Sequence, residues 1–235
     1  MKNTKKNQEI FVESIKHIDS FFKLSAHIGN KKWHPTMSSN LIASRNAVYI
    51  LDISKTIKGL FNALDVISSI VSQKGHILFI NSNPLYNKLL QKTCELTEQS
   101  YVNNRWVGGT LTNWPIISKE IETYKKVVTQ LHLYTSLFYV STPRYEKMKK
   151  SFQGFQTPIS KPDLLIVLNP SKNKEAINEA WVLNIPVIAI VDSDTNLSKI
   201  TYPIPGNNSS YEFIYYCLNI IVKTITNKYN TSVRD

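Results

Sequence analysis

Cysteine and glycine, on which many functional sites depend, are scarce in this 235-residue chain, which contains two cysteines and seven glycines. Cys94 and Cys217 each lie in an apolar, helix-like segment, and neither has a Cys or His at metal-ligand spacing. The sequence therefore predicts two buried free thiols in a reducing compartment and no metal site. The five histidines are scattered and form no ligand pair, and we expect no cofactor.

The motifs of common α/β enzymes are missing as well. No G-x-G-x-x-G follows an expected strand, and the chain contains neither a G-x-x-x-x-G-K-[ST] loop nor a G-x-S-x-G elbow. No apolar run reaches the roughly 18 residues of a membrane span. The first residues, MKNTKKNQEI, lack both the apolar core of a secretory signal and the pattern of a transit peptide. We expect a protein that is made where it works, or whose targeting segment is not in this chain.

Acidic residues are few, with 17 Asp and Glu against 28 Lys and Arg, so the formal net charge is +11. The excess is uneven, because residues 101–160 carry eight basic against three acidic residues and residues 161–235 carry seven of each. Such a balance favours a polyanionic partner. We expect the N-terminal part and the middle of the chain to face it. Nucleic acid is the first candidate, and an anionic membrane surface is a weaker one.

Short apolar runs alternate with amphipathic segments along the chain. This alternation predicts a three-layer α/β/α fold with a parallel sheet, of flavodoxin-like or Rossmann-like type. A long basic segment does not fit the alternation and is interpreted as a protruding helical hairpin. The expected organisation is an N-terminal extension over 1–19, a core formed by 20–111 and 156–235, and an inserted hairpin over 112–155. We expect strands near 47–53, 76–81, 101–102, 162–169 and 186–192, and helices near 8–24, 54–73 (capped by Ser54), 84–99, 172–183 and 210–227. The segment YPIPGNNSS is expected to be a loop.

Asp52, Asp192 and Asp194 lie at or just beyond the ends of expected strands. Acids at such positions could hold a metal or act as an acid and base pair, which would make the protein a nucleotide- or metal-binding enzyme. Strand-end acids more often cap the following turn or helix. We favour the second interpretation because no His, Cys or further acid supports a site, and we predict that the protein is not an enzyme.

Basic residues cluster beside aromatic ones in two regions. Lys31, Lys32 and Trp33 combine ammonium groups with an indole, which suits phosphate contact plus stacking on a sugar or base. The second region is the expected hairpin, where the lysines and arginine would form a basic finger. Its candidate residues are Lys125, Lys126, Arg144, Lys147, Lys149 and Lys150. A solvated surface is the plainer interpretation of any single lysine, but two clusters together favour an RNA-binding surface.

The stretch YVNNRWVGGTLTNW, residues 101–114, places the only Gly-Gly pair between two tryptophans. We interpret Trp106, Gly108, Gly109 and Trp114 as a structural corner where the core meets the hairpin. The glycines would permit close backbone approach or a positive φ there, so Gly108→Val should impair folding. Arg105 has two possible roles: it braces the corner, or it reaches an RNA phosphate.

Several long motifs, in the right order, resemble the small ribosomal subunit protein 2 family. AHIGNKKWHPTM (26–37), SRNAVYILDISKT (44–56) and YVNNRWVGGTLTNW look like its signatures, and PDLLIVLNP, EAINEAWVLNIPVIAIVDSD and YPIPGN are similar to its C-terminal half. Asn30, Asn169 and Asn184 depart from the family pattern, and the 112–160 segment is the least similar part. The resemblance implies a structural protein of the small ribosomal subunit that contacts rRNA and neighbouring proteins, with a parallel α/β core and a helical hairpin.

The divergence and the Lys-, Asn- and Ile-rich composition favour a mitochondrial member over a plastid one, with bacterial cytoplasm as a further alternative. We expect no membrane partner and no homo-oligomer. The residues expected to face rRNA are Lys31, Lys32, Trp33, Arg45, Arg105, Lys125, Lys126, Arg144, Lys147, Lys149 and Lys150.

Overall fold

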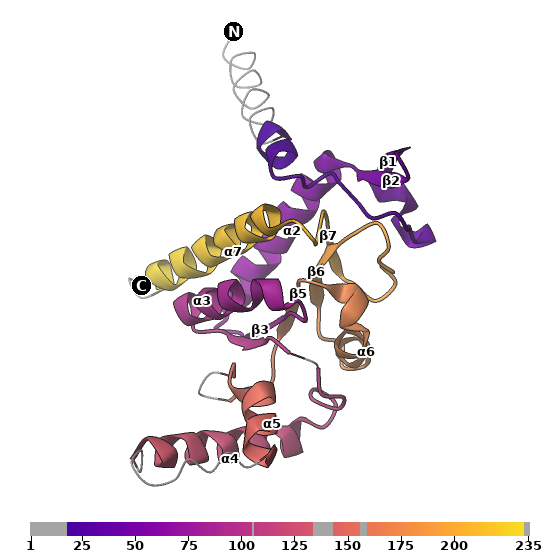
Figure 1. Cartoon of the computed structure of the whole chain (residues 1–235). Coiled ribbons are helices and arrows are strands. Elements are labelled where there is room, and N and C mark those ends of the chain that lie inside the picture. Colours follow the sequence, from indigo (N-terminus) through magenta and orange to yellow (C-terminus); the bar gives the residue numbers. More distant parts are fainter. Residues whose placement is uncertain (1–17, 105, 134–142, 156–158, 233–235) are drawn as a thin grey trace.

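A five-stranded parallel sheet forms the centre of the protein, as the sequence predicted. The computed structural model describes residues 18–104, 106–133, 143–155 and 159–232 (Figure 1). The strand order is β4-β3-β5-β6-β7. The bounds are β3 Ile77–Ile80, β4 Ser100–Val102, β5 Leu164–Val167, β6 Val187–Val191 and β7 Tyr202–Pro205. The chain moves outward from β3 in both directions, so its topological switch point lies between β3 and β5.

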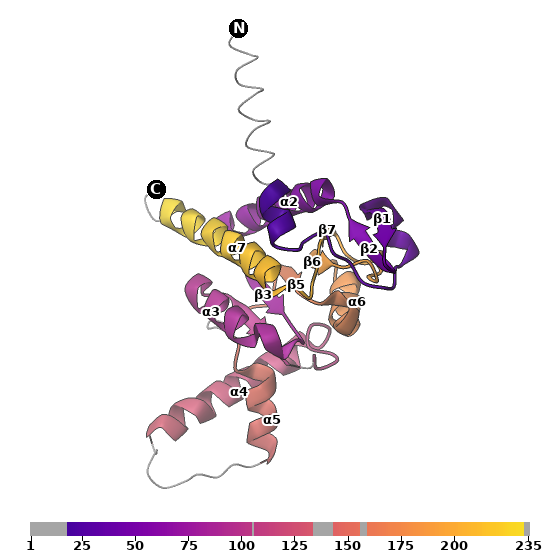
Figure 2. The ribbon, with the colours of Figure 1, turned by 45° about the horizontal axis from the view of Figure 1, so that its top comes forward.

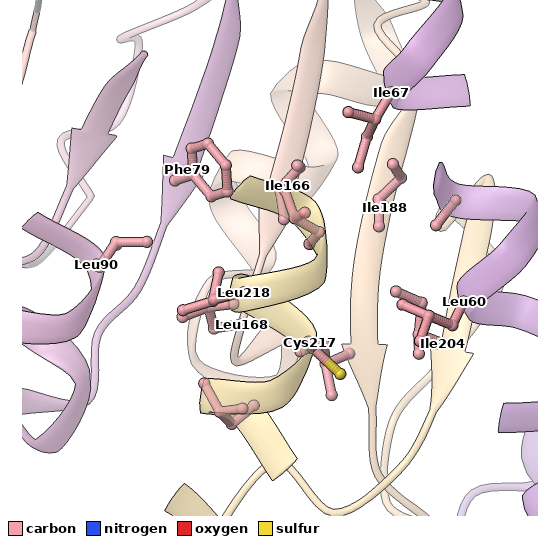
Figure 3. Close-up of a cluster of buried hydrophobic side chains, with 14 of the residues drawn as sticks. Leu60, Ile67, Phe79, Leu90, Ile166, Leu168, Ile188, Ile204, Cys217 and Leu218 are labelled. Carbon is pink, nitrogen blue, oxygen red and sulfur yellow. The ribbon is translucent and has the colours of Figure 1, made fainter. Parts of the chain in front are cut away.

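Both faces of the sheet are buried. Alternate side chains of each strand point to opposite faces and therefore enter different core layers. Ile77 and Phe79 of β3 pack on the side of helices α2 (Ile53–Ser72), α3 (Asn87–Thr97) and α7 (Tyr211–Ser232). Leu78 and Ile80 pack on the other side, with helix α6 (Lys174–Val182). Figure 3 shows the first layer, in which Phe79, Ile166 and Ile188 of the strands meet Leu60 and Ile67 of α2 and Leu218 of α7.

The predicted strand at 47–53 exists, but its expected place in the parallel sheet is wrong. β2 (Val48–Leu51) pairs antiparallel with β1 (Leu41–Arg45) in a separate two-stranded sheet. The turn between them is tight because Asn46 and Ala47 both have positive φ, 52° and 60°. Only Leu51 of β2 is buried. A short β-branched run indicates a strand but carries no information about which strand it will pair with.

The expected loop at YPIPGNNSS is also a wrong prediction, since its first residues form β7. β7 pairs parallel with β6 and forms the edge of the sheet, the position where proline is tolerated because one side of the strand needs no hydrogen-bond donor. Pro203 and Pro205 lie two residues apart, so their nitrogens, which carry no hydrogen, face the same side of the strand. Helix α2 covers this edge, and a Cβ added to Gly59 would meet the Pro203 carbonyl at 2.6 Å.

The remaining helices follow the sequence prediction closely, with changes at their ends. Asp52 rather than Ser54 caps α2, because its carboxylate accepts a hydrogen bond from Ser54 N at 2.9 Å. A 3-10 turn, Pro84–Tyr86, precedes α3, and two others cover Pro35–Asn40 and Pro170–Lys172. Of the expected helix at 8–24, residues 18–23 are described and helical.

Helices α4 (Trp114–Leu133) and α5 (Pro143–Phe152) lie against each other below the sheet in Figure 1, as expected for the hairpin. The base of this pair is part of the second core layer, where Ile117, Ile121 and Phe152 are buried. Glu122 and Lys126 of α4 are exposed. The domain boundaries stay a prediction.

Candidate nucleic-acid interface

The loop that carries Lys31, Lys32 and Trp33 is anchored to the turn that follows β6. Ser193 makes the connection: its Oγ accepts a hydrogen bond from Asn30 N at 2.8 Å and donates one to the Lys32 carbonyl at 2.7 Å. His34 N donates to the Ser193 carbonyl at 2.8 Å. Sequence reasoning missed Ser193, because nothing in the sequence pairs a residue after one strand with a loop 163 residues earlier.

Anchoring leaves the cations of this loop in solvent. Lys31 and Lys32 are exposed, and so is Arg45 at the end of β1. The Trp33 side chain is 45% exposed, and its ring centroid lies 6.1 Å from that of Tyr49 on β2. A held, exposed indole beside ammonium groups has the geometry needed for contact with a nucleic-acid backbone and base.

The second group of predicted cations lies on α4 and α5. Lys126, Lys147, Lys149 and Lys150 are exposed. Lys125 is partly buried, and burial lowers the pKa of its ammonium group. The Arg144 side chain and Arg105 fall outside the described residues. The structure does not bring the two groups together, because the β1–β2 ribbon and the α4–α5 pair lie at opposite ends of the molecule (Figures 1 and 2).

A carboxylate that the sequence did not single out holds the corner between core and hairpin. Glu179 of α6 accepts hydrogen bonds from Trp106 Nε1 at 2.9 Å, from Gly109 N at 2.8 Å and from Leu111 N at 2.8 Å. Thr112 N donates to the same carboxylate at 3.2 Å. Burial raises the pKa of Glu179, but these hydrogen bonds outweigh it and the pKa is lowered. A carboxylate with so many N–H donors is a strong clamp.

The corner residues differ in what they contribute. Trp106 is buried, and Trp114 is half-buried with its ring centroid 6.1 Å from that of Phe155. Gly109 has a φ of 87°, which favours glycine. The expectation for Gly108 is wrong, because a Cβ added there would meet nothing within 4 Å. The need for glycine belongs to Gly109 alone, and the sequence could not separate two identical neighbours.

The strand-end acids serve the fold. Asp52 caps α2, and Asp192 Oδ1 accepts a hydrogen bond from Ser193 N at 2.6 Å. Ser171 Oγ lies 3.4 Å from Asp194 Oδ1, to which it donates. Within the described residues, no group of three His, Cys, Asp or Glu side chains could hold a metal ion. These geometries do not support the alternative of an enzyme built on these acids.

We predict that Asp192→Asn removes a pH dependence of stability. Burial raises the pKa of Asp192 to about 6 from 3.8, with an opposing hydrogen bond from Ser193 and a raising contribution from the charge of Asp194. Because the folded pKa is the higher one, the folded state binds more protons in this window, and stability falls as the pH rises from 3.8 to about 6. The variant should therefore gain stability relative to wild type across that window, by at most about 3 kcal/mol. Urea unfolding at several pH values measures this, and a difference that does not change with pH would contradict it.

The prediction for the two cysteines can be checked within the described part of the chain. Cys94 and Cys217 are free and buried, as predicted, and burial raises the pKa of each thiol. Among the helices of the described ranges, none has both the length and the apolar character needed to cross a membrane.

These observations define the class of the protein: a basic, three-layer α/β protein whose strand-end acids act as a helix cap and as turn anchors. Comparison with known sequences places it more closely. The pattern of the Ribosomal protein S2 family matches residues 21–228. Small ribosomal subunit protein uS2m of Marchantia polymorpha is 38% identical over 214 residues, which cover 88% of this chain and 90% of that protein. Small ribosomal subunit protein uS2 of Rickettsia typhi is 36% identical over 211 residues, covering 86% and 72%.

The chain therefore belongs to the ribosomal protein S2 family, as its motifs implied. Its role is that of a structural constituent of the small ribosomal subunit. The family is structural and non-enzymatic, and it implies binding to rRNA and to other small-subunit proteins.

Proposed function

We propose that this protein is a component of the mitochondrial small ribosomal subunit. The similarity to uS2m, the mitochondrial form in Marchantia polymorpha, over nine-tenths of that protein's length is the observation that carries the proposal. The Lys-, Asn- and Ile-rich composition agrees with an AT-rich organellar genome. Rickettsial proteins of the family are also similar, at 34–36% identity, so bacterial cytoplasm and plastid are the alternatives that the experiment must separate.

In this proposal the protein binds small-subunit rRNA through phosphate contacts, as one copy per subunit, and catalyses no reaction. The support is the exposure of Lys31, Lys32 and Arg45 at one end of the molecule, and of the α4 and α5 lysines at the other. Ammonium and guanidinium groups held in solvent contribute phosphate contacts that position a protein on RNA. The proposed rRNA-facing set also contains Trp33, Lys125, Arg105 and Arg144, and the rRNA contacts of the whole set stay predictions.

Fractionation of the source cells tests the compartment and the assembly together. An epitope-tagged copy of the full chain should sediment with the small subunit from purified mitochondria, at the same stoichiometry as other small-subunit proteins. The fraction of protein released from the subunit should rise steeply with salt concentration, because the phosphates that the protein neutralises regain counterions when it dissociates. Sedimentation with plastid or cytoplasmic small subunits would overturn the mitochondrial assignment. Sedimentation free of any subunit at low salt would contradict the ribosomal role itself.

A further inference from the structure

We infer that the carboxyl edge of the parallel sheet and the adjoining β6–β7 loop carry Lys172, Lys174 and Lys199 as a third rRNA-binding surface, which joins the two basic groups at the ends of the molecule into one continuous track for an RNA backbone. The inference rests on the proposed function. Average charge hid this surface from sequence reasoning, because the C-terminal third of the chain is neutral in sum.

A series of open cavities forms the path. One cavity is lined by His34, Lys174 and Lys199, and His34 follows directly on the Lys31–Lys32 loop that Ser193 anchors. A second cavity shares Ser171 and Lys174 with the first and extends to Trp106 at the corner. The third begins at the next residue, Val107, and continues between α4 and α5. The path therefore runs from the β1–β2 end to the hairpin.

The charge along this path is positive. The three cavities are lined by five lysines and three carboxylates, and Lys31 and Lys32 lie at one end. The lysines are Lys119, Lys147, Lys172, Lys174 and Lys199, and the carboxylates are Glu120, Glu175 and Asp194. Of the other acids of the neutral third, Glu179 is partly buried with its carboxylate hydrogen-bonded to N–H groups of the corner, and Asp192 is buried. Folding thus separates charges that cancel in the sequence.

The uncharged groups of the path also suit phosphate. Ser82, Ser171, Thr195 and Ser198 line the first two cavities with hydroxyls, and Asn178 and Asn196 add amides. Lysine, hydroxyl and amide side chains are the groups that contact phosphate oxygens in protein–nucleic acid complexes. α6 begins here, at Lys174, so the positive end of its dipole points toward the same edge. The lining is polar at this edge, which favours an RNA backbone over an apolar protein segment.

The first test compares two triple variants of the full chain for binding to transcribed small-subunit rRNA across a salt series. One variant is Lys172→Gln, Lys174→Gln and Lys199→Gln. The control is Lys74→Gln, Lys92→Gln and Lys223→Gln, which removes equal charge from exposed lysines elsewhere. In the edge variant, the slope of log affinity against log salt should become shallower by about 2 to 3. Its affinity should fall on the order of a hundredfold near ~0.1 M salt. The control should lose much less.

Equal losses in the two variants, with wild type binding normally, would overturn the inference and leave the proposed function standing. Absence of binding by wild type would remove the proposed function and the inference together. Circular dichroism of both variants checks that they are folded.

The second test reads proximity. Because both native thiols are buried, an iron chelate can be attached to a new exposed cysteine, at Ser198→Cys beside the path or at Ser72→Cys at the end of α2. In assembled small subunits, hydroxyl radicals should cut the rRNA backbone near position 198 and not near position 72. No cutting from position 198 in subunits that contain the protein would overturn the inference.

Discussion

Replacing Glu179 by alanine should lower the free energy of unfolding by about 3 kcal/mol. The carboxylate is the shared acceptor for four N–H donors of the corner, from Trp106, Gly109, Leu111 and Thr112. Truncation leaves these donors without that acceptor where water reaches them poorly, since Trp106 and Leu111 are buried. Urea unfolding followed by circular dichroism measures the loss.

Two companion variants separate the clamp from general effects of charge. Glu175→Ala, one turn earlier in α6 and exposed, should cost less than about 1 kcal/mol. Glu179→Gln should be intermediate, and its deficit relative to wild type should shrink as the pH falls below 4.5. The folded pKa of Glu179 is lowered, so its contribution is present above the ordinary value of 4.5 and is lost as the pH falls through the folded value. A Glu179→Ala protein as stable as wild type would refute the clamp.

Gly154→Ala should destabilise the protein by about 3 kcal/mol, while Gly108→Ala should change stability by less than about 0.5 kcal/mol. A Cβ at Gly154 would lie 2.1 Å from the Tyr101 carbonyl oxygen, and neither backbone can yield easily because Tyr101 N donates to the Gly154 carbonyl at 2.9 Å. A Cβ at Gly108 meets nothing within 4 Å. Thermal and urea unfolding of the two variants give the comparison.

The pair distinguishes close packing from a general preference for glycine. Equal stability of the Gly154→Ala and Gly108→Ala proteins would contradict the close approach of the chain to β4. A large loss at Gly108 alone would restore the packed corner that the sequence suggested.

Glu179 and Gly154 lie at the two places where the α4–α5 hairpin joins the core. Glu179 fixes the chain where it leaves the core toward α4, and Gly154 lets the chain return from α5 directly against β4. The hairpin is therefore tied to the sheet on entry and on exit. We expect both variants to misdirect α4 and α5, and so to weaken incorporation into subunits beyond what their stability loss alone explains.

The sequence predicted much of the fold because burial on two faces leaves a simple signal. Runs such as ILFI and VIAIV are apolar at every position, which is typical of strands covered on both sides. The same signal misplaced the run at 47–53, which has similar composition but pairs with β1. It also missed β7, whose prolines indicate a loop until an edge position accommodates them.

The sequence by itself determined the family, the class of fold, the basic excess and the lack of a recognisable catalytic set, because these depend on residue type, order and local period. Only the tertiary structure decided that Ser193 holds the Lys31–Lys32 loop, that Glu179 holds the corner, and that the lysines of a neutral segment line two adjoining cavities. Each of these joins residues tens to more than a hundred positions apart. No local sequence pattern encodes such a contact. The order of the strands in the sheet, and the loops that lie beside each strand end, decide which distant groups meet.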